Sequence, residues 1–186
     1  MNIMIVGVGG QGTLLASRIL GMVAIKEGYD VKVSEVHGMS QRGGSVVTYV
    51  KYGDKVYSPI IDRGEADLIL AFEMLEAMRA LPYLKKGGKM IANTQKMNPM
   101  PVITGAMEYP ENIEEKLSAK INLQAVDALS LAEKAGTIKA VNVVLIGLLA
   151  KSMDVDKNVW IDVIKETVPE KFLDVNIKAF ELGYEL

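Results

Sequence analysis

The 186-residue sequence contains no cysteine and a single histidine, His37. The lack of cysteine excludes disulfides, thiolate zinc sites and cysteine-ligated iron–sulfur clusters from this chain. One histidine is too few for a histidine metal cluster, so no metal-binding residues are predicted. If the protein takes part in redox chemistry, another chain must hold the electron carriers.

Neither a strong net charge nor a long hydrophobic run is present. The chain has 21 Lys and Arg against 23 Asp and Glu, a net charge of −2, and this balance predicts no nucleic-acid partner. The longest apolar stretch, residues 140–150, is shorter than the about 20 residues that a membrane-spanning helix needs. The N-terminus lacks a signal-peptide pattern, so we expect a cytoplasmic protein with no membrane partner.

What is present is an apolar fraction of 49%, which is typical of a globular protein. No linker or repeat divides the sequence, so residues 1–186 are predicted to form one domain. Hydrophobic periodicity predicts alternating strands and helices. The predicted strands lie within 2–12, 29–36, 66–72, 89–94 and 121–126, with a hairpin over 45–61 and a short strand at 101–104 in a loop over 95–112. The predicted helices lie at 13–28, 73–88, around 114–117 and at 128–136, and three more follow.

This order of elements predicts an α/β fold with three layers and a mainly parallel sheet. The first 36 residues form a β-α-β unit, the start of a Rossmann-like fold, whose crossover should be right-handed. The hairpin, with its turn at Gly53 and Asp54, is an insertion into that sheet. The helix at 140–150 is apolar on nearly every side, which favours the core over a subunit interface. A buried Asn142 in this helix needs a hydrogen-bond partner.

The segment GVGGQG after the first strand has the G-x-G-x-x-G spacing at Gly7, Gly9 and Gly12. Glycines allow a tight turn there, and free N–H groups at the start of a helix can face a phosphate. The residues predicted to bind a ligand or phosphate are Gly7, Gly9, Gly10, Gln11, Gly12 and Thr13. Glu35 lies near the position, about 20 residues on, from which an acidic side chain binds a ribose in dinucleotide folds. Such loops also occur where a helix merely packs close to a strand, so both interpretations stay open.

A second loop, EVHGMSQRGG, follows the second predicted strand at residues 35–44. Together with GVGGQGTLLASRIL, it resembles the gamma-type domain of the 2-oxoacid:ferredoxin oxidoreductases, and most of all the small (beta) subunit of the indolepyruvate type. The segments ADLILAFEMLEAMRALPYLKKGGKMIANT, AVNVVLIGLLAK and FLDVNIKAFELG extend the resemblance over nearly the whole chain.

The resemblance implies a subunit of an enzyme that oxidatively decarboxylates a 2-oxoacid, acylates coenzyme A and reduces ferredoxin. It implies that thiamine diphosphate and iron–sulfur clusters are held by a large (alpha) partner subunit, and that this chain is auxiliary and supplies no catalytic residue. The missing cysteines agree with that division, and the sequence has no Gly-Asp-Gly thiamine diphosphate motif. An aryl 2-oxoacid such as indolepyruvate is the expected substrate class, although no residue here distinguishes it from an aliphatic one.

The second loop is predicted to be a joint to the large subunit with a role in coenzyme A binding. The predicted interface or coenzyme A residues are His37, Ser40, Gln41, Arg42, Gly43 and Gly44. For His37, an ordering hydrogen bond or an interface contact is favoured over proton transfer. Arg42 suits a coenzyme A phosphate, a partner carboxylate or a local ion pair. Ser40 and Gln41 either bind the ligand or cap the loop, and the two glycines permit a close backbone approach or a positive φ.

Two other classes of protein share the glycine pattern. A stand-alone NAD- or nucleotide-binding Rossmann-like protein would need a catalytic tyrosine–lysine or histidine–acid set, and none is evident. An adenylating enzyme similar to the ubiquitin-activating proteins would need further arginines and metal-binding aspartates, and no clear set is present. Glu73 and Glu76, at the start of a predicted helix, are expected to oppose the helix dipole and not to form an acid–base pair.

Overall fold

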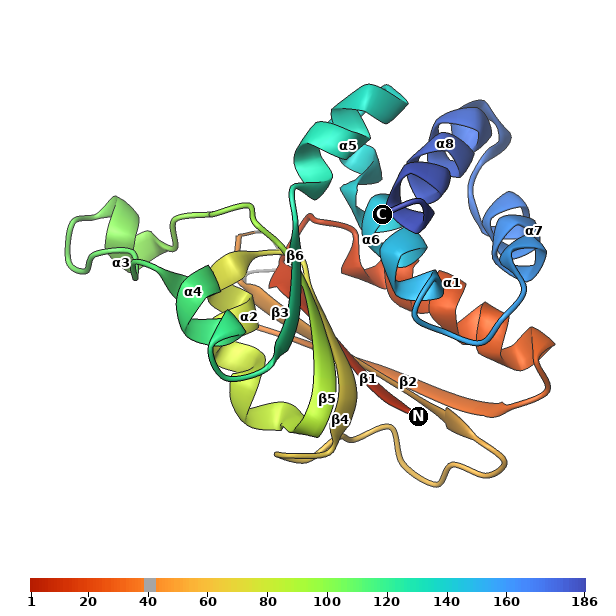
Figure 1. Cartoon of the computed structure of the whole chain (residues 1–186), viewed down its shortest axis with the longest axis horizontal. Helices are drawn as coiled ribbons and strands as arrows, with labels where there is room; N and C mark the ends of the chain where they lie inside the picture. Colours follow the sequence, from red (N-terminus) through yellow and green to blue (C-terminus); the bar gives the residue numbers. More distant parts are fainter. Residues whose placement is uncertain (39–42) are drawn as a thin grey trace.

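The computed structural model describes residues 1–38 and 43–186, so Ser40, Gln41 and Arg42 lie outside the described residues. One sheet lies between two layers of helices, which confirms the predicted three-layer α/β class (Figure 1). The strands are β1 (Asn2–Val8), β2 (Asp30–His37), β3 (Ser45–Gly53), β4 (Ala66–Ala71), β5 (Leu84–Asn93) and β6 (Asn122–Val126). The helices are α1 (Thr13–Lys26), α2 (Met74–Ala80), α3 (Met100–Ile103), α4 (Ile113–Ser118), α5 (Ala128–Ala135), α6 (Val141–Ala150), α7 (Lys157–Thr167) and α8 (Leu173–Tyr184). Short 3-10 helices are η1 (Leu81–Tyr83), η2 (Ile138–Ala140) and η3 (Glu170–Phe172).

The strand order is β2-β3-β1-β4-β5-β6. β1, β4, β5 and β6 pair in parallel, whereas β3 is antiparallel to both β1 and β2. Within this sheet a single strand therefore runs against the other five, so the sheet is mainly parallel, as predicted. β3 separates β2 from β1, so the first β-α-β unit does not close on adjacent strands.

The predicted hairpin over 45–61 is wrong in its pairing. β3 ends at Gly53 and pairs backwards with β2, in register from Asp30 opposite Gly53 to His37 opposite Val46. No strand forms over 55–61, although Val56 is buried and its N–H donates to the Asp30 carboxylate at 2.9 Å. Because β3 already has β1 and β2 as its two neighbours, residues 55–61 have no open edge of β3 with which to pair.

Two further boundaries differ from the prediction. The helix predicted over 73–88 ends at Ala80, and β5 already begins at Leu84, with an irregular register between Ala66 and Leu68 of β4. The short strand predicted over 101–104 is the helix α3, in which the Pro99 carbonyl accepts the N–H groups that follow it. Proline suits the first turn of a helix, where the missing N–H would have no partner.

Both faces of the central strands are buried, and each face contributes to its own core. Ile3 and Ile5 of β1 point into the core beneath α1 and α5–α8, whereas Met4 and Val6 point into the core beneath α2 and α4. This two-sided burial explains why the central strands have continuous apolar sequences and no polar alternation.

The helix at the centre of the larger layer is α6, in which all ten residues are buried. The favoured interpretation of this apolar helix as core is thus confirmed. α6 packs against α8 with Gly147 and Gly183 at the contact, where a Cβ atom on either glycine would strike the backbone of the other helix. Among the described residues, no helix is long and apolar enough to cross a bilayer.

Candidate functional site

The carboxyl ends of β1, β4 and β5 meet at one edge of the sheet, where α/β proteins bind ligands. The glycine loop follows β1, the pair Glu73 and Glu76 follows β4, and residues from Gln95 onward follow β5. Gly43 and Gly44 lead into β3, which is antiparallel and therefore begins at the same edge. The edge brings together the two loops singled out in the sequence.

The two predicted loops are joined by backbone hydrogen bonds. The N–H of Gly9 donates to the carbonyl of Gly44 at 2.8 Å, and the N–H of Gly43 donates to the carbonyl of Gly9 at 3.2 Å. These bonds extend the β1–β3 ladder beyond the pair Val8 and Ser45. Gly43 has a φ of 78°, the left-handed conformation that its predicted flexibility anticipated. The two motifs therefore form one structural unit.

A cavity of about 310 Å³ lies at the N-terminus of α1. Its lining residues are Gly9, Gly10, Gly12, Thr13, Leu14, Glu35, His37 and Val46. Gly12 precedes the helix and provides no side-chain cap, and the first turn of α1 contains no acidic residue. The orphan N–H groups and the positive end of the helix dipole therefore favour an anion here.

Gly12 itself is required by packing as well as by conformation. Its φ is 84°, and a Cβ atom would lie 2.5 Å from Nδ2 of Asn142. That amide donates to the Gly12 carbonyl at 3.3 Å, and its Oδ1 accepts from the N–H of Val143 at 2.9 Å. Buried Asn142 thus has the partners it was expected to need, and it ties α6 to the glycine loop.

Two of the six predicted glycine-loop residues, Gly7 and Gln11, do not line this cavity. Gln11 points into the protein, where its Oε1 accepts the N–H of Val8 at 2.7 Å. Its Nε2 donates to the Phe72 carbonyl at 3.1 Å and to Gln95 at 3.4 Å. Gln11 therefore links the ends of β1, β4 and β5, and acts as a brace inside the site.

The acidic and imidazole side chains predicted near this loop do reach the cavity. Glu35 lines it and accepts a hydrogen bond from Thr48 at 3.3 Å. His37 is exposed, and its Nδ1 lies 3.0 Å from the carbonyl of the adjacent Gly38. That contact is local, as expected of a residue that orders a loop.

The sequence predicted only a helix-dipole role for Glu73 and Glu76 at the start of α2, and did not predict that both are buried. Glu73 is 1% exposed and Glu76 is 4% exposed. Glu73 caps α2, because its Oε2 accepts from the N–H of Glu76 at 3.0 Å. Its Oε1 also accepts from the N–H of Met97 at 3.0 Å and from the hydroxyl of Tyr109 at 2.5 Å. Burial, and next the bond to the Glu73 carboxylate, hold the pKa of Tyr109 well above its usual value.

Glu76 connects α2 to the second loop. Its Oε2 accepts from Ser45 at 2.5 Å, and its Oε1 pairs with Arg79 at 2.6 Å. Ser45 directly follows Gly43 and Gly44, so this buried carboxylate fixes the end of the loop. The signal available in the sequence was two glutamates directly after a buried strand. Their partners lie 31 and 36 residues away from them and could not be inferred from local pattern.

A second cavity, of about 600 Å³, lies on the other side of the joined loops. Its polar part is formed by Gly43, Gly44, Ser45, Glu73, Glu76, Arg79 and Asn98. Its apolar part includes residues of α3 and of the segment that leads into it.

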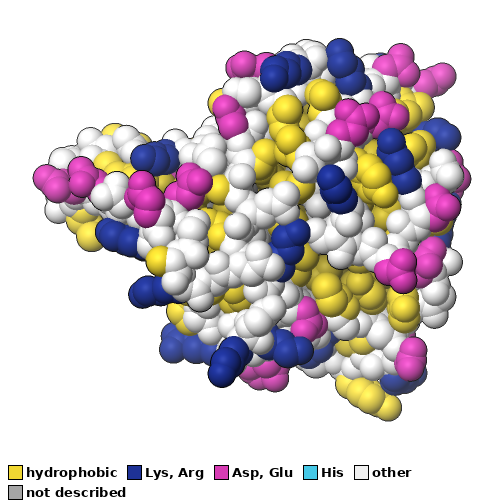
Figure 2. Space-filling view, viewed as in Figure 1, with side chains coloured by type: hydrophobic (Ala, Val, Ile, Leu, Met, Phe, Trp, Pro, Cys, Tyr) yellow, Lys and Arg dark blue, Asp and Glu magenta, His cyan; other side chains and the backbone are white. Residues whose placement is uncertain are grey.

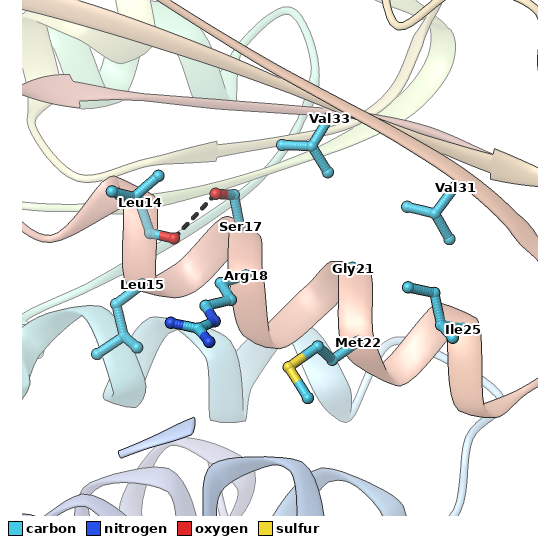
Figure 3. Close-up of a pocket in the computed structure, with 9 residues that line it drawn as sticks. All are labelled: Leu14, Leu15, Ser17, Arg18, Gly21, Met22, Ile25, Val31 and Val33. Atoms are coloured by element: carbon cyan, nitrogen blue, oxygen red, sulfur yellow. Dashed lines mark hydrogen bonds between the residues drawn. The ribbon is translucent and has the colours of Figure 1, made fainter. Parts of the chain in front are cut away.

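A third hollow of about 610 Å³ follows the outer side of α1. Figure 3 shows side chains of α1 on one side and Val31 and Val33 of β2 on the other. Leu14 lines both this hollow and the cavity at the glycine loop. The apolar hollow and the candidate anion site therefore share Leu14.

Residues 2–186 match the family described as pyruvate ferredoxin/flavodoxin oxidoreductase. The chain belongs to this family. The resemblance drawn from the two loops is thereby confirmed.

Relatives within the pyruvate ferredoxin/flavodoxin oxidoreductase family are named as subunits. Indolepyruvate oxidoreductase subunit IorB of Thermococcus kodakarensis is 46% identical over 190 residues, which cover 98% of this chain and 93% of the relative. The gamma subunit of a keto/oxoacid ferredoxin oxidoreductase from Geobacter sulfurreducens has a similar structure, with a TM-score of 0.74 at 25% identity and coverage of 99% and 96%. Ketoisovalerate oxidoreductase subunit VorA of Methanothermobacter marburgensis is 28% identical over 98% of this chain but only 36% of its own length. Sequences of this kind therefore occur both as whole small chains and as parts of longer ones.

Proposed function

We propose that this chain is the small subunit of a 2-oxoacid:ferredoxin oxidoreductase that acts on an aryl 2-oxoacid such as indolepyruvate. Family membership and the relative named for indolepyruvate support this class of enzyme. Comparing kcat/KM for indolepyruvate and for an aliphatic 2-oxoacid, using the assembled enzyme, tests the substrate class. Equal values, or a preference for the aliphatic acid, would contradict it.

The cofactors are proposed to reside on a large partner subunit. The present chain has no cysteine with which to hold an iron–sulfur cluster. Thiamine diphosphate, when bound by the partner, supplies the chemistry of decarboxylation, and the clusters pass electrons to ferredoxin. Purified alone, this chain is expected not to reduce a dye with indolepyruvate and coenzyme A, and turnover by the isolated chain would refute the auxiliary role.

The part proposed for this chain is to bind and orient coenzyme A. The observation that supports it is the cavity at the start of α1, which Gly9 and Gly12 of the first loop line together with His37 of the second. The backbone bonds of Gly9 to Gly43 and Gly44 hold the two loops together beside it. The N–H groups of the first turn would face the diphosphate. A volume of about 310 Å³ is at the small end of ligand sites, so it suits a diphosphate with its neighbouring sugar and leaves the thiol arm free to reach the partner.

Leu14 offers a direct test of the anion site. Its side chain is 63% exposed and lies in the first turn of α1, beside the cavity. Leu14→Glu would add a negative charge that suits the helix dipole but repels a phosphate. Leu14→Gln is the control, because glutamine has nearly the shape of glutamate without its charge. In the assembled enzyme we expect Leu14→Glu to raise KM for coenzyme A about 10-fold, equivalent to about 1.4 kcal/mol. The Gln variant should change it little.

The result must be separated from a loss of assembly. Size-exclusion chromatography of both Leu14 variants with the large subunit would show whether the complex forms. If Leu14→Glu assembles and keeps the normal KM for coenzyme A, the anion site is not used and the proposed role fails.

A stand-alone nucleotide-binding protein is the second candidate, because Glu35 lines the cavity from the position that binds a ribose in dinucleotide folds. Calorimetry of the isolated chain with NAD separates the two candidates. We expect no heat of binding, and micromolar affinity for NAD would favour the second.

A further inference from the structure

The segment from Met97 to Tyr109, called here the arm, projects from the body of the molecule. It includes α3 and lies far to the left of the sheet in Figure 1. Met100, Ile103 and Met107 are 66%, 63% and 65% exposed. Three large apolar side chains within eight residues are therefore left in water on one projection.

The arm is a folded element with an internal network. Pro99 accepts the N–H groups of Val102 and Ile103 at 2.9 and 3.0 Å, and the N–H of Met107 donates to the Pro101 carbonyl at 3.0 Å. A turn that holds its own backbone bonds keeps the backbone that carries these side chains in a fixed course. Such preorganisation reduces the entropy that binding would otherwise cost.

Glu73 holds both ends of the arm. One oxygen of this buried carboxylate accepts from the N–H of Met97 and from the hydroxyl of Tyr109, the first and last residues of the arm. The ammonium of Lys96 also lies 6.0 Å from the centre of the Tyr109 ring. The base of the arm is thus fixed to the start of α2.

The arm adjoins the candidate site. Met97, Pro99, Met100 and Ile103 line the 600 Å³ cavity together with the pair Gly43–Gly44. A surface that covers the joined loops would therefore also meet the arm. Exposed apolar groups that are clustered in this way mark sites of protein association, and methionine adapts its shape to a partner.

The charge around the arm limits the kind of partner. Residues 96–116 contain four glutamates, of which Glu108 lies in the arm and the other three follow it, and two lysines, Lys96 and Lys116. Figure 2 shows several acidic side chains together with apolar ones on the projection, and fewer basic side chains beside them. A symmetric contact between the arms of two copies would bring these acidic groups against one another, which disfavours a second copy of this chain.

We propose that the arm is a docking element for the large subunit, which presents to it an apolar hollow with a basic rim. The inference rests on the proposed function, because it takes the large subunit as the partner. Glu73 is the positioning residue that aims the arm. The methionines and Ile103 supply the buried contact, and Glu108 with the glutamates that follow the arm supplies the complementary charge.

Three isoleucines of similar exposure on three faces provide the test. Ile103 on the arm is 63% exposed, Ile25 beside the α1 hollow is 61% exposed, and Ile138 in η2 is 57% exposed. Each would be changed to Glu, and the dissociation constant for the large subunit would be measured by sedimentation at several concentrations. We expect Ile103→Glu to weaken association about 30-fold, about 2 kcal/mol, with less than about 3-fold for the other two.

Melting temperatures keep the comparison interpretable. Because Ile103 is exposed, Ile103→Glu should have the same melting temperature as the wild type. Met107→Glu is a second arm variant, for which we expect the same loss of association. If both arm variants bind the large subunit as well as Ile138→Glu does, the arm is not the docking element. If Ile25→Glu alone weakens binding, the α1 hollow is the contact and the proposal is overturned.

The remaining outcomes are also decisive. If the wild-type chain and large subunit do not associate at any concentration, the proposed function fails, and the inference fails with it. If the isolated chain dimerises and Ile103→Glu makes it monomeric, the occupant is a second copy and the inference fails alone. The inference is supported if the wild type associates with the large subunit and both arm variants lose this association while their melting temperatures stay unchanged.

Discussion

The two faces of the sheet are built in different ways. On one face, α6 is buried along its whole length and meets α8 at two glycines. On the other, α2 begins with two buried glutamates whose oxygens accept hydrogen bonds from residues far away in the sequence. The first layer provides stability by close apolar packing. The second fixes positions, since it holds the loops and the arm at the carboxyl edge of the sheet.

This contrast predicts that damage to the two layers has different consequences. A defect between α6 and α8 should lower the stability of the whole molecule. A defect at Glu73 should alter the geometry of the carboxyl edge of the sheet, and the largest change should occur in the arm.

The largest effect is expected at Gly147. In Gly147→Ala, the new methyl group would strike the Phe180 carbonyl, and this overpacking should outweigh the better helix propensity of alanine. We expect the free energy of unfolding to fall by about 3 kcal/mol. Gly53→Ala is the matched control, because a Cβ atom there meets nothing within 4 Å. Urea denaturation that shows equal stabilities for the two variants would contradict the packing account.

Glu73 should give a smaller but more local effect. Glu73→Ala leaves the N–H of Met97 and the hydroxyl of Tyr109 without their buried acceptor, which should cost about 2 kcal/mol. Hydrogen exchange should accelerate in residues 97–109 while exchange in α6 and α8 changes only with overall stability. Glu73→Gln, which keeps one acceptor oxygen, should fall between wild type and Ala. A uniform acceleration over the whole chain would show that Glu73 does not anchor the arm.

The smallest effect concerns pH. Burial and the Glu73 carboxylate raise the pKa of Tyr109 above its ordinary value of about 10. Because the folded state holds this proton more tightly, the contribution to stability is complete below about pH 10 and is lost as the pH rises through the folded-state pKa. Tyr109→Phe should therefore lose less stability than wild type on going above pH 10. A parallel decline of both proteins in denaturant titrations would argue against the shift.

The contrast also explains what could be predicted from the sequence. Apolar runs identified the central strands and the buried helix at 140–150, because burial on all sides leaves a direct mark on composition. The pairing of β3 with β2 could not be inferred, since the turn signal at Gly53 and Asp54 indicates a bend but not the partner of the strand.

At the site, local motifs found the loops but not their supports. The spacing of Gly7, Gly9 and Gly12 and the pair Gly43–Gly44 marked the segments that come together. Gln11 appeared as a ligand contact, although its amide braces three strands from within. Glu73 was expected only to oppose the helix dipole, because its bond to Tyr109 depends on the course of the chain between them.

The central claim is that the carboxyl edge of the sheet faces the large subunit. Hydrogen exchange measured by mass spectrometry, on this chain alone and in the assembled complex, tests it most directly. We predict slower exchange on assembly in residues 7–13 and 97–109, with no change in α7 and α8. Protection of α7 and α8 with an unchanged edge would contradict the account.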